Sequence, residues 1–225
     1  TYIGSHSSSC LSGGGGGPLP GACSDLFFSE YGEGSSNHKY IEIYNPTSSA
    51  ISLAGYTVYL SGNGGSYTNT FTSNASIASG DVYVVSTNQA DSIIQAAADT
   101  ILSYPSIVHF NGDDALILFD GTDTIDVIGV PGVDPGSSWP VGSGSTANHT
   151  LVRMASITGG TTDWTTGALE WDVYPQNTWT YIGSHSSSCL SGGGGGPLPG
   201  ACSDLFFSEY GEGSSPHKYI EIYNP

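Results

Sequence analysis

The sequence predicts an all-β sandwich with one short helix, repeated in a tandem array joined by Gly/Pro linkers. Three observations lead to this fold class. Short runs rich in aromatic and β-branched residues are separated by Gly, Asn and Asp turn signals. The chain has 14 Tyr, 7 Phe and 4 Trp, enough for a core, although only 10% of its residues are charged. A long segment also occurs twice.

The duplicated segment covers residues 1–46 and returns as residues 180–225, with Pro216 in place of Asn37 as the one difference. Near-identity over this length indicates recent duplication within a longer chain. We therefore expect the end of a preceding repeat with its linker (1–24), a sandwich domain (25–185), a second linker (186–203) and the start of the next repeat (204–225). The Gly/Pro composition of both linkers cannot bury a core.

Residues 25–185 supply the strands. Residues 40–44 alternate, which places Ile41 and Ile43 on one face of a strand and Tyr40, Glu42 and Tyr44 on the other. The pair Asp120-Gly121 predicts a tight hairpin. Residues 88–100 suit the short helix. The expected strands are 26–31, 40–44, 56–60, 67–72, 81–86, 107–110, 115–119, 124–130 and 150–154.

Several blocks of this domain occur in a characteristic order, namely residues 26–47, 51–56, 111–115, 125–129, 150–153 and 170–175. Together they resemble the bacterial lamin tail domain over roughly residues 26–183. The resemblance implies an immunoglobulin-like sandwich. It also implies a secreted bacterial setting, where such modules accompany nucleases, phosphatases and surface proteins. It does not imply catalysis by the module itself.

Each linker carries two cysteines separated by twelve residues. Four cysteines in an acidic β protein indicate an oxidising compartment, and therefore an extracellular or cell-surface location. We expect disulfides Cys10–Cys23 and Cys189–Cys202, each tying the end of one domain to the start of the next. The alternative is that the cysteines are inert and unrelated.

The charge balance limits the classes of binding partner that the sequence favours. The chain has 20 acidic and only 3 basic residues, with a formal net charge of −17. So few cations disfavour nucleic-acid binding, and no apolar run is long enough to span a membrane. One period of 179 residues holds 16 acidic and 2 basic residues, so copies in an array would repel one another.

Calcium is the metal that this acidity favours, because it binds six to eight oxygen ligands, often on loops. The candidate ligands are Glu30, Glu33 and Glu42, and Asp113, Asp114, Asp120 and Asp123. None follows the EF-hand spacing. The alternative is that Asp113 and Asp120 shape turns and that Glu30 and Glu42 face solvent. We expect no other cofactor.

The sequence predicts no enzyme. It contains neither a Gly-x-Ser-x-Gly elbow nor a His-Glu-x-x-His pair. Residues 4–8 bring Ser5 and His6 together, but in a predicted linker, where we expect His6 to be solvated. Our leading hypothesis is a structural repeat unit of an extracellular bacterial fibre or surface stalk, assembled head to tail.

Contact between neighbouring repeats is expected at Leu205, Phe206, Phe207 and Tyr210, in a strand that could complete the previous domain's sheet. Two alternatives remain open. One is an adhesive or carbohydrate-binding module that uses Trp139, Trp164, Trp171 and Trp179. The other is an accessory domain of a secreted nuclease or phosphatase.

Overall fold

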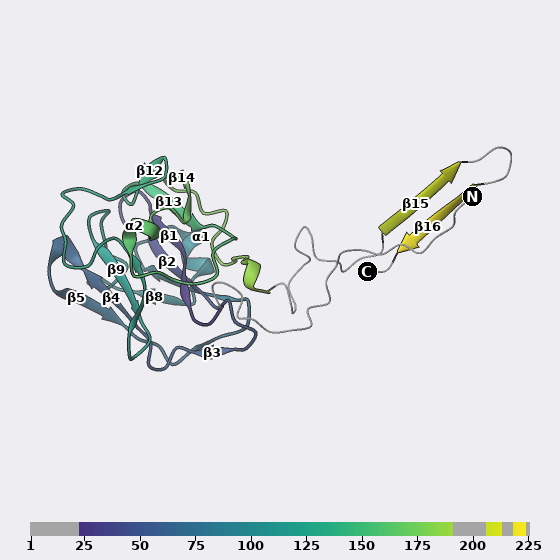
Figure 1. Cartoon of the computed structure of the whole chain (residues 1–225). Helices are drawn as coiled ribbons and strands as arrows, with labels where there is room; N and C mark the ends of the chain where they lie inside the picture. The colour runs from purple at the N-terminus through teal and green to yellow at the C-terminus, as the bar shows by residue number, and fades with distance from the viewer. Residues whose placement is uncertain (1–22, 191–205, 213–217, 224–225) are drawn as a thin grey trace. The chain divides into compact units, whose positions relative to one another are not determined.

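The computed structural model describes residues 23–190, 206–212 and 218–223. The chain divides into two units. Residues 23–190 belong to the larger unit and form a β-sandwich (Figure 1). In the other unit, β15 (Phe206–Glu212) and β16 (Lys218–Tyr223) form an antiparallel hairpin. The predicted all-β class is confirmed: the described chain contains several sheets and two short α-helices.

The first sheet of the sandwich has six strands in the order β14-β13-β1-β2-β7-β8. Their bounds are β14 Trp171–Pro175, β13 His149–Arg153, β1 Phe27–Glu33, β2 Lys39–Tyr44, β7 Val82–Thr87 and β8 Thr100–Leu102. Neighbours are antiparallel except β7 and β8, which are parallel. The central pair, β1 and β2, is therefore flanked by strands on both sides.

The second sheet has four strands in the order β10-β9-β4-β5, with bounds Thr124–Ile128, Ala115–Phe119, Thr57–Ser61 and Tyr67–Phe71. Two small antiparallel pairs are β3 (Ile51–Ser52) with β6 (Ser76–Ile77), and β11 (Pro140–Val141) with β12 (Gly144–Ser145). The helices are α1 (Ser92–Ala97), α2 (Trp164–Gly167) and the 3₁₀ turns η1 (Gly62–Gly64) and η2 (Ser188–Leu190).

The main core lies between the two sheets. Phe28 and Ile43 on the inner face of the first sheet pack in one buried cluster with Leu116 and Leu118 of β9. Alternation along β1 and β2 directs these side chains to the same face. Trp139, Trp164 and Trp171 are all less than 8% exposed and belong to this cluster. Three of the four tryptophans therefore serve packing.

Two expectations about local structure need correction. Residues 107–110 are not a strand; they form a turn, in which the His109 N–H donates to the Ser106 carbonyl at 3.1 Å. The apolar side chains of this run are buried because the turn is inserted into the core, so hydrophobicity alone suggested a strand. The helix is shorter than expected, since the Asp91 side chain caps its start and β8 follows soon after Ala98. In the described residues, no helix is long and apolar enough to cross a membrane.

Candidate functional site

The outer face of β1 and β2 is as buried as the inner face. Five side chains on this face are at most 1% exposed: Phe27, Glu30, Tyr40, Glu42 and Tyr44. The register pairs Phe27 with Tyr44 and Glu30 with Glu42 across the two strands. The alternative that Glu30 and Glu42 face solvent is therefore wrong. A later part of the chain covers them.

That cover is a segment of the chain after β14, residues 176–189, which we call the strap. Trp179 and Ile182 of the strap pack on a small cluster that contains Tyr40 and Val84 of the sheet and Ile94 of α1. The ring of Trp179 also lies edge-on to His38, with the ring centroids 5.6 Å apart. The strap thus closes a second, smaller core on the outside of the sheet.

His185 is the central aromatic contact of the strap. Its ring centroid lies 4.8 Å from that of Tyr44 and 5.9 Å from that of Phe27, edge to face in both cases. Burial, together with the smaller effect of the positive charge of Arg153, lowers the pKa of His185 to about 4. His6 is the copy of this residue in the duplicated segment and was expected to be solvated, but it lies outside the described residues. His185 itself is an uncharged residue that packs on the sheet.

The strap also joins a buried acidic pair. The Gly183 N–H donates to Glu42 Oε2 at 2.7 Å, and the Ser29 hydroxyl donates to Glu42 Oε1 at 2.7 Å. The Tyr40 hydroxyl donates to Glu30 Oε1. Burial raises the pKa of Glu42 to about 7 and that of Glu30 to about 8, against the lowering effect of these hydrogen bonds. Both carboxyl groups therefore titrate near neutral pH.

A disulfide fixes the end of the strap. Cys189 bonds Cys23, with 5.6 Å between their Cα atoms. The Ser187 hydroxyl donates to the Ile157 carbonyl at 2.8 Å just before it. The predicted partners of Cys23 and Cys189 were wrong; Cys10 and Cys202 lie outside the described residues. The prediction paired cysteines that are close in sequence, whereas the strap brings the end of the domain back to its start.

The packed domain consequently extends beyond the expected boundary at residue 185. Ser187 is 3% exposed, and the Ser188 N–H donates to the Ala155 carbonyl at 2.8 Å. The segment 186–189 is therefore part of the domain, although its composition is that of a linker. Trp179 and Ile182 gave a usable signal in the sequence, because a solvated connection has no need of such apolar side chains.

A buried ion-pair network lies next to Phe27 of the outer face. Arg153 lies 3.3 Å from Asp126 Oδ1 and 2.7 Å from Glu170 Oε2. Its guanidinium also lies over the rings of Phe27 and Trp171. Burial raises the pKa of Asp126, while Arg153 and three backbone N–H donors oppose that rise. The arrangement holds β1 against the second sheet, because the Phe28 N–H donates to Asp126 at 2.9 Å.

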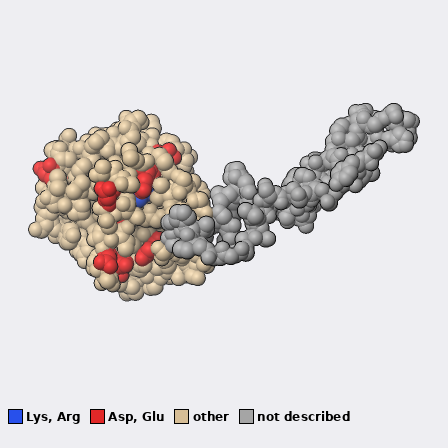
Figure 2. Space-filling view, in the orientation of Figure 1, with Lys and Arg blue, Asp and Glu red and all other residues tan. Residues whose placement is uncertain are grey.

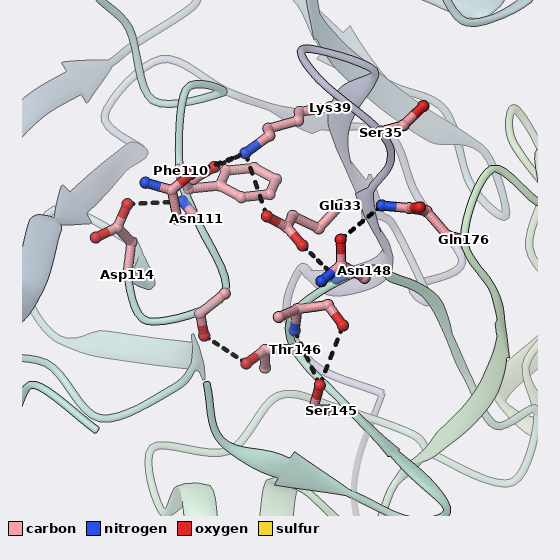
Figure 3. A network of polar contacts seen from close by, with 12 residues as sticks. Glu33, Ser35, Lys39, Phe110, Asn111, Asp114, Ser145, Thr146, Asn148 and Gln176 are labelled. Atoms are coloured by element: carbon pink, nitrogen blue, oxygen red, sulfur yellow. Dashed lines mark hydrogen bonds and ion pairs between the residues drawn. The ribbon is translucent and has the colours of Figure 1, made fainter. Parts of the chain in front are cut away.

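A second polar network lies at the other end of β1 and β2 (Figure 3). Lys39 is 3.2 Å from Glu33 and also donates to the Phe110 carbonyl and to Asn111. The Asn148 N–H donates to the other oxygen of Glu33. This buried network ties the β1–β2 hairpin to two loops, so Glu33 has a structural role here.

The remaining predicted calcium ligands are dispersed. Asp114 accepts the N–H groups of Asn63 and Asn111, at 2.8 and 2.7 Å. Asp120 accepts those of Thr122 and Asp123 within the β9–β10 turn. In residues 23–190 and the two later strands, no three His, Cys, Asp or Glu side chains are grouped to hold a metal ion. Calcium binding stays a prediction without a described cluster.

Comparison of the sequence with models of protein families shows to which family the chain belongs. The model of the Lamin Tail Domain matches residues 20–132, half of the chain. The chain belongs to the lamin tail domain family. A search of curated proteins finds no match. The matched residues include β1, β2 and the second sheet but end before β13, β14 and the strap, so the strap lies outside the part that defines this lamin tail domain.

The surface of this lamin tail domain is strongly acidic. Figure 2 shows acidic side chains scattered over the face in view. In residues 23–190, both basic residues, Lys39 and Arg153, are at most 6% exposed and lie in ion pairs. Within residues 23–190, both cationic side chains are therefore largely covered and neutralised by acidic neighbours.

Two open clefts flank the strap of the lamin tail domain. One of about 460 Å³ lies beside the disulfide and is lined by residues that include Asp25 and Glu170. The other, of about 350 Å³, is lined in part by Tyr174, Tyr181 and His185. Both are shallow and mixed in polarity.

Proposed function

We propose that this lamin tail domain is a non-enzymatic structural repeat of an extracellular bacterial fibre or surface stalk. One observation carries the proposal: the Cys23–Cys189 bond joins the two ends of the domain, with their Cα atoms 5.6 Å apart. A chain that enters at Cys23 and leaves at Cys189 transmits tension through this covalent bond. The force then bypasses the sandwich, which is not unfolded by it.

This arrangement reverses the mechanical role expected from the sequence. The disulfides expected from the sequence would close each glycine-rich linker and tie the end of one domain to the start of the next, so that tension would pass through the domains. With the domain bypassed by the Cys23–Cys189 bond, the load falls on the linker. Twelve residues separate Cys189 from the next cysteine, Cys202. A segment of that length extends to about 45 Å at most. Each repeat would thus contribute one extensible linker and one protected domain.

Two further observations support a repeat in an array. The strands of the second hairpin, β15 and β16, carry the same sequences as β1 and β2 and pair in the same register. The acidic surface would keep neighbouring filaments apart. By contrast, three of the four tryptophans are buried, which removes them from stacking on a sugar. The observations therefore favour a structural repeat over a carbohydrate-binding module.

Single-molecule force spectroscopy tests the load path. The variant Cys10→Ser/Cys202→Ser leaves Cys23 and Cys189 as the only pair. Under oxidising conditions we expect no extension step from the sandwich. After reduction, unfolding should release the 166-residue separation between these cysteines as a step of about 550–600 Å. An equally long step in the oxidised chain would refute the shielded domain.

Electron microscopy tests the array itself. Unreduced parent protein, with its full set of repeats, should form beaded filaments with one bead per repeat. Compact particles without regular spacing would contradict the fibre while leaving the load path of a single domain intact.

A further inference from the structure

Most of the strap sequence occurs twice in this chain. Residues 180–189 are identical to residues 1–10. The face that the strap covers is also duplicated, since β15 and β16 repeat the residues of β1 and β2, including the counterparts of Phe27, Glu42 and Tyr44. A strap from any copy would therefore find the same contacts on the face of any other copy. Sequence alone does not restrict a strap to its own domain.

The contacts of the strap are local and can be transferred as a set. They include the His185 ring on Phe27 and Tyr44, the Gly183 N–H on Glu42, and the packing of Trp179 and Ile182 on the small outer cluster. The bonds of Ser187 and Ser188 to the carbonyl groups of Ile157 and Ala155 complete the set. None of these contacts is a rung of the β-sheet ladder. The strap can thus leave the face without separating two strands, and the inner core between the sheets stays in place.

A single turn directs the strap back onto its own domain. Asn177 has φ of 65°, the left-handed conformation that few residues adopt. Its side chain accepts the Ser35 N–H at 2.9 Å, and the Thr178 hydroxyl donates to the Pro175 carbonyl at 2.8 Å. Opening this turn would extend the chain away from the end of β14. Asn177 is therefore the hinge that decides which face the strap reaches.

The distance to a neighbouring repeat is within reach. A domain of this length has a radius of gyration of about 15 Å. The twelve residues between Cys189 and Cys202 extend to about 45 Å, so a strap and the next outer face are held at high effective concentration. Identical contacts and a short tether place the closed and exchanged arrangements close in free energy.

We infer that the outer face of β1 and β2 is a docking site for the strap of a second copy of this domain, and that strap exchange links neighbouring copies. The inference rests on the proposed structural repeat. In the exchanged form, His185 and Gly183 of one copy contact Phe27, Tyr44 and Glu42 of the next, and Cys189 bonds the next copy's Cys23. This replaces the bond within each shielded domain by a bond between neighbours, so exchange converts separate beads into a covalently interlocked filament whose domains lie in the path of the force.

Isotope mixing tests the exchange on the chain itself, in the Cys10→Ser/Cys202→Ser variant. Chains labelled with ¹⁴N and ¹⁵N are reduced, mixed at high concentration and reoxidised with glutathione disulfide. The oxidant takes two electrons and two protons from the thiols of Cys23 and Cys189 and leaves as two glutathione molecules. We expect the dimer fraction to yield Cys23–Cys189 peptide pairs of mixed isotope in about half of its pairs. The monomer fraction should yield none.

A matched pair of hinge variants sharpens the test. Asn177→Pro cannot adopt a positive φ, whereas Asn177→Gly adopts it freely, and both lose the bond to Ser35. We expect Asn177→Pro to raise the dimer fraction severalfold over Asn177→Gly. If Asn177→Pro does not fold, the isotope experiment decides alone. Pairs of a single isotope in every fraction would overturn the exchange, and beaded filaments in the same preparation would show that the repeat function stands without it.

Discussion

The two faces of the six-stranded sheet are equally buried at β1 and β2 but are built differently. The inner face presents Phe28, Ile41 and Ile43 to the second sheet and is apolar. The outer face presents Glu30 and Glu42 among aromatic rings and is covered by the strap. The inner cover is a sheet; the outer cover is a segment held by side-chain contacts, a few hydrogen bonds and one disulfide. The outer face is therefore where this domain can open without unfolding.

The largest effect should come from the disulfide. In the chain-entropy model, losing a cross-link with a sequence separation of 166 residues costs about 5 kcal/mol of unfolding free energy. We expect that loss for Cys23→Ser/Cys189→Ser in denaturant titrations. Hydrogen exchange should also rise at the Gly183 and Ser188 amides, on the outer side, but not in β9.

Cys10→Ser/Cys202→Ser is the control for that experiment. It removes the same number of thiols and should leave the stability of the sandwich unchanged. Equal losses for the two double variants would mean that the Cys23–Cys189 bond does not hold the outer cover.

Two adjacent phenylalanines separate the faces directly. Phe28→Ala should cost about 3–5 kcal/mol, because it leaves a cavity in the main core. Phe27→Ala should be coupled to His185→Ala by about 0.5–1.5 kcal/mol, because the two rings are in contact. A double-mutant cycle of Phe28→Ala with His185→Ala should show no coupling energy. Equal coupling at both positions, measured by denaturant titration, would erase the distinction between the faces.

The pH dependence should arise on the outer face. The raised pKa of Glu42, about 7, means that the folded state binds a proton that the unfolded chain releases above about pH 4.5. This contribution to stability is complete below pH 4.5 and is lost as the pH rises through 7. Glu30, with a pKa of about 8, acts in the same direction. His185 acts oppositely, since its lowered pKa removes stability as the pH falls from 6.5 towards 4.

Glu42→Gln isolates the first of these contributions. The amide imitates the protonated acid, because it can accept the Gly183 N–H and donate to the Ser29 hydroxyl. We compare the unfolding free energy of the variant with that of the unchanged chain at each pH. This difference should be more favourable to the variant at pH 8 than at pH 4.5, by on the order of 1–3 kcal/mol. Asp172→Asn, on the exposed part of β14, is the control and should show no such gain. A flat difference between the two pH values for Glu42→Gln would contradict a buried carboxyl group under the strap.

The smallest effect concerns the one difference between the repeats. Asn37 donates to Gln89 in the turn between β1 and β2, and the preceding Ser36 has φ of 58°. Asn37→Pro removes the donor and restricts the residue before it, which should cost about 1 kcal/mol. Asn37→Ala removes only the hydrogen bond and should cost less. Equal stabilities of both variants would show that the backbone of this turn is indifferent to proline.

Much of the fold followed from alternation and turn signals. Ile41 and Ile43 face the core and Asp120-Gly121 forms the β9–β10 turn, as expected. The cover of the outer face did not follow, because alternation predicts only which side a residue faces, not whether something lies on that side. For that reason the sequence offered only two roles for Glu42, a calcium ligand or a solvent-facing residue. Its partner Gly183 lies 141 residues away in a segment of linker-like composition.

The cysteine pairing failed for a related reason. Loop-closure arguments favour partners that are near in sequence, and both linkers have such pairs. The observed bond depends on the path of the strap, which is set by the rings of Trp179 and His185 on the sheet. Only a three-dimensional placement of these side chains brings Cys189 to Cys23.

Disulfide mapping of the unreduced chain tests the central claim most directly. Proteolysis without reduction, followed by mass spectrometry, identifies the partner of each cysteine. The structure predicts a peptide pair that joins Cys23 to Cys189, across a sequence separation of 166 residues. Peptide pairs that join Cys10 to Cys23 and Cys189 to Cys202 would contradict it, because Cys202 is the next repeat's counterpart of Cys23 and each strap would then be bonded to its neighbour and not to its own domain.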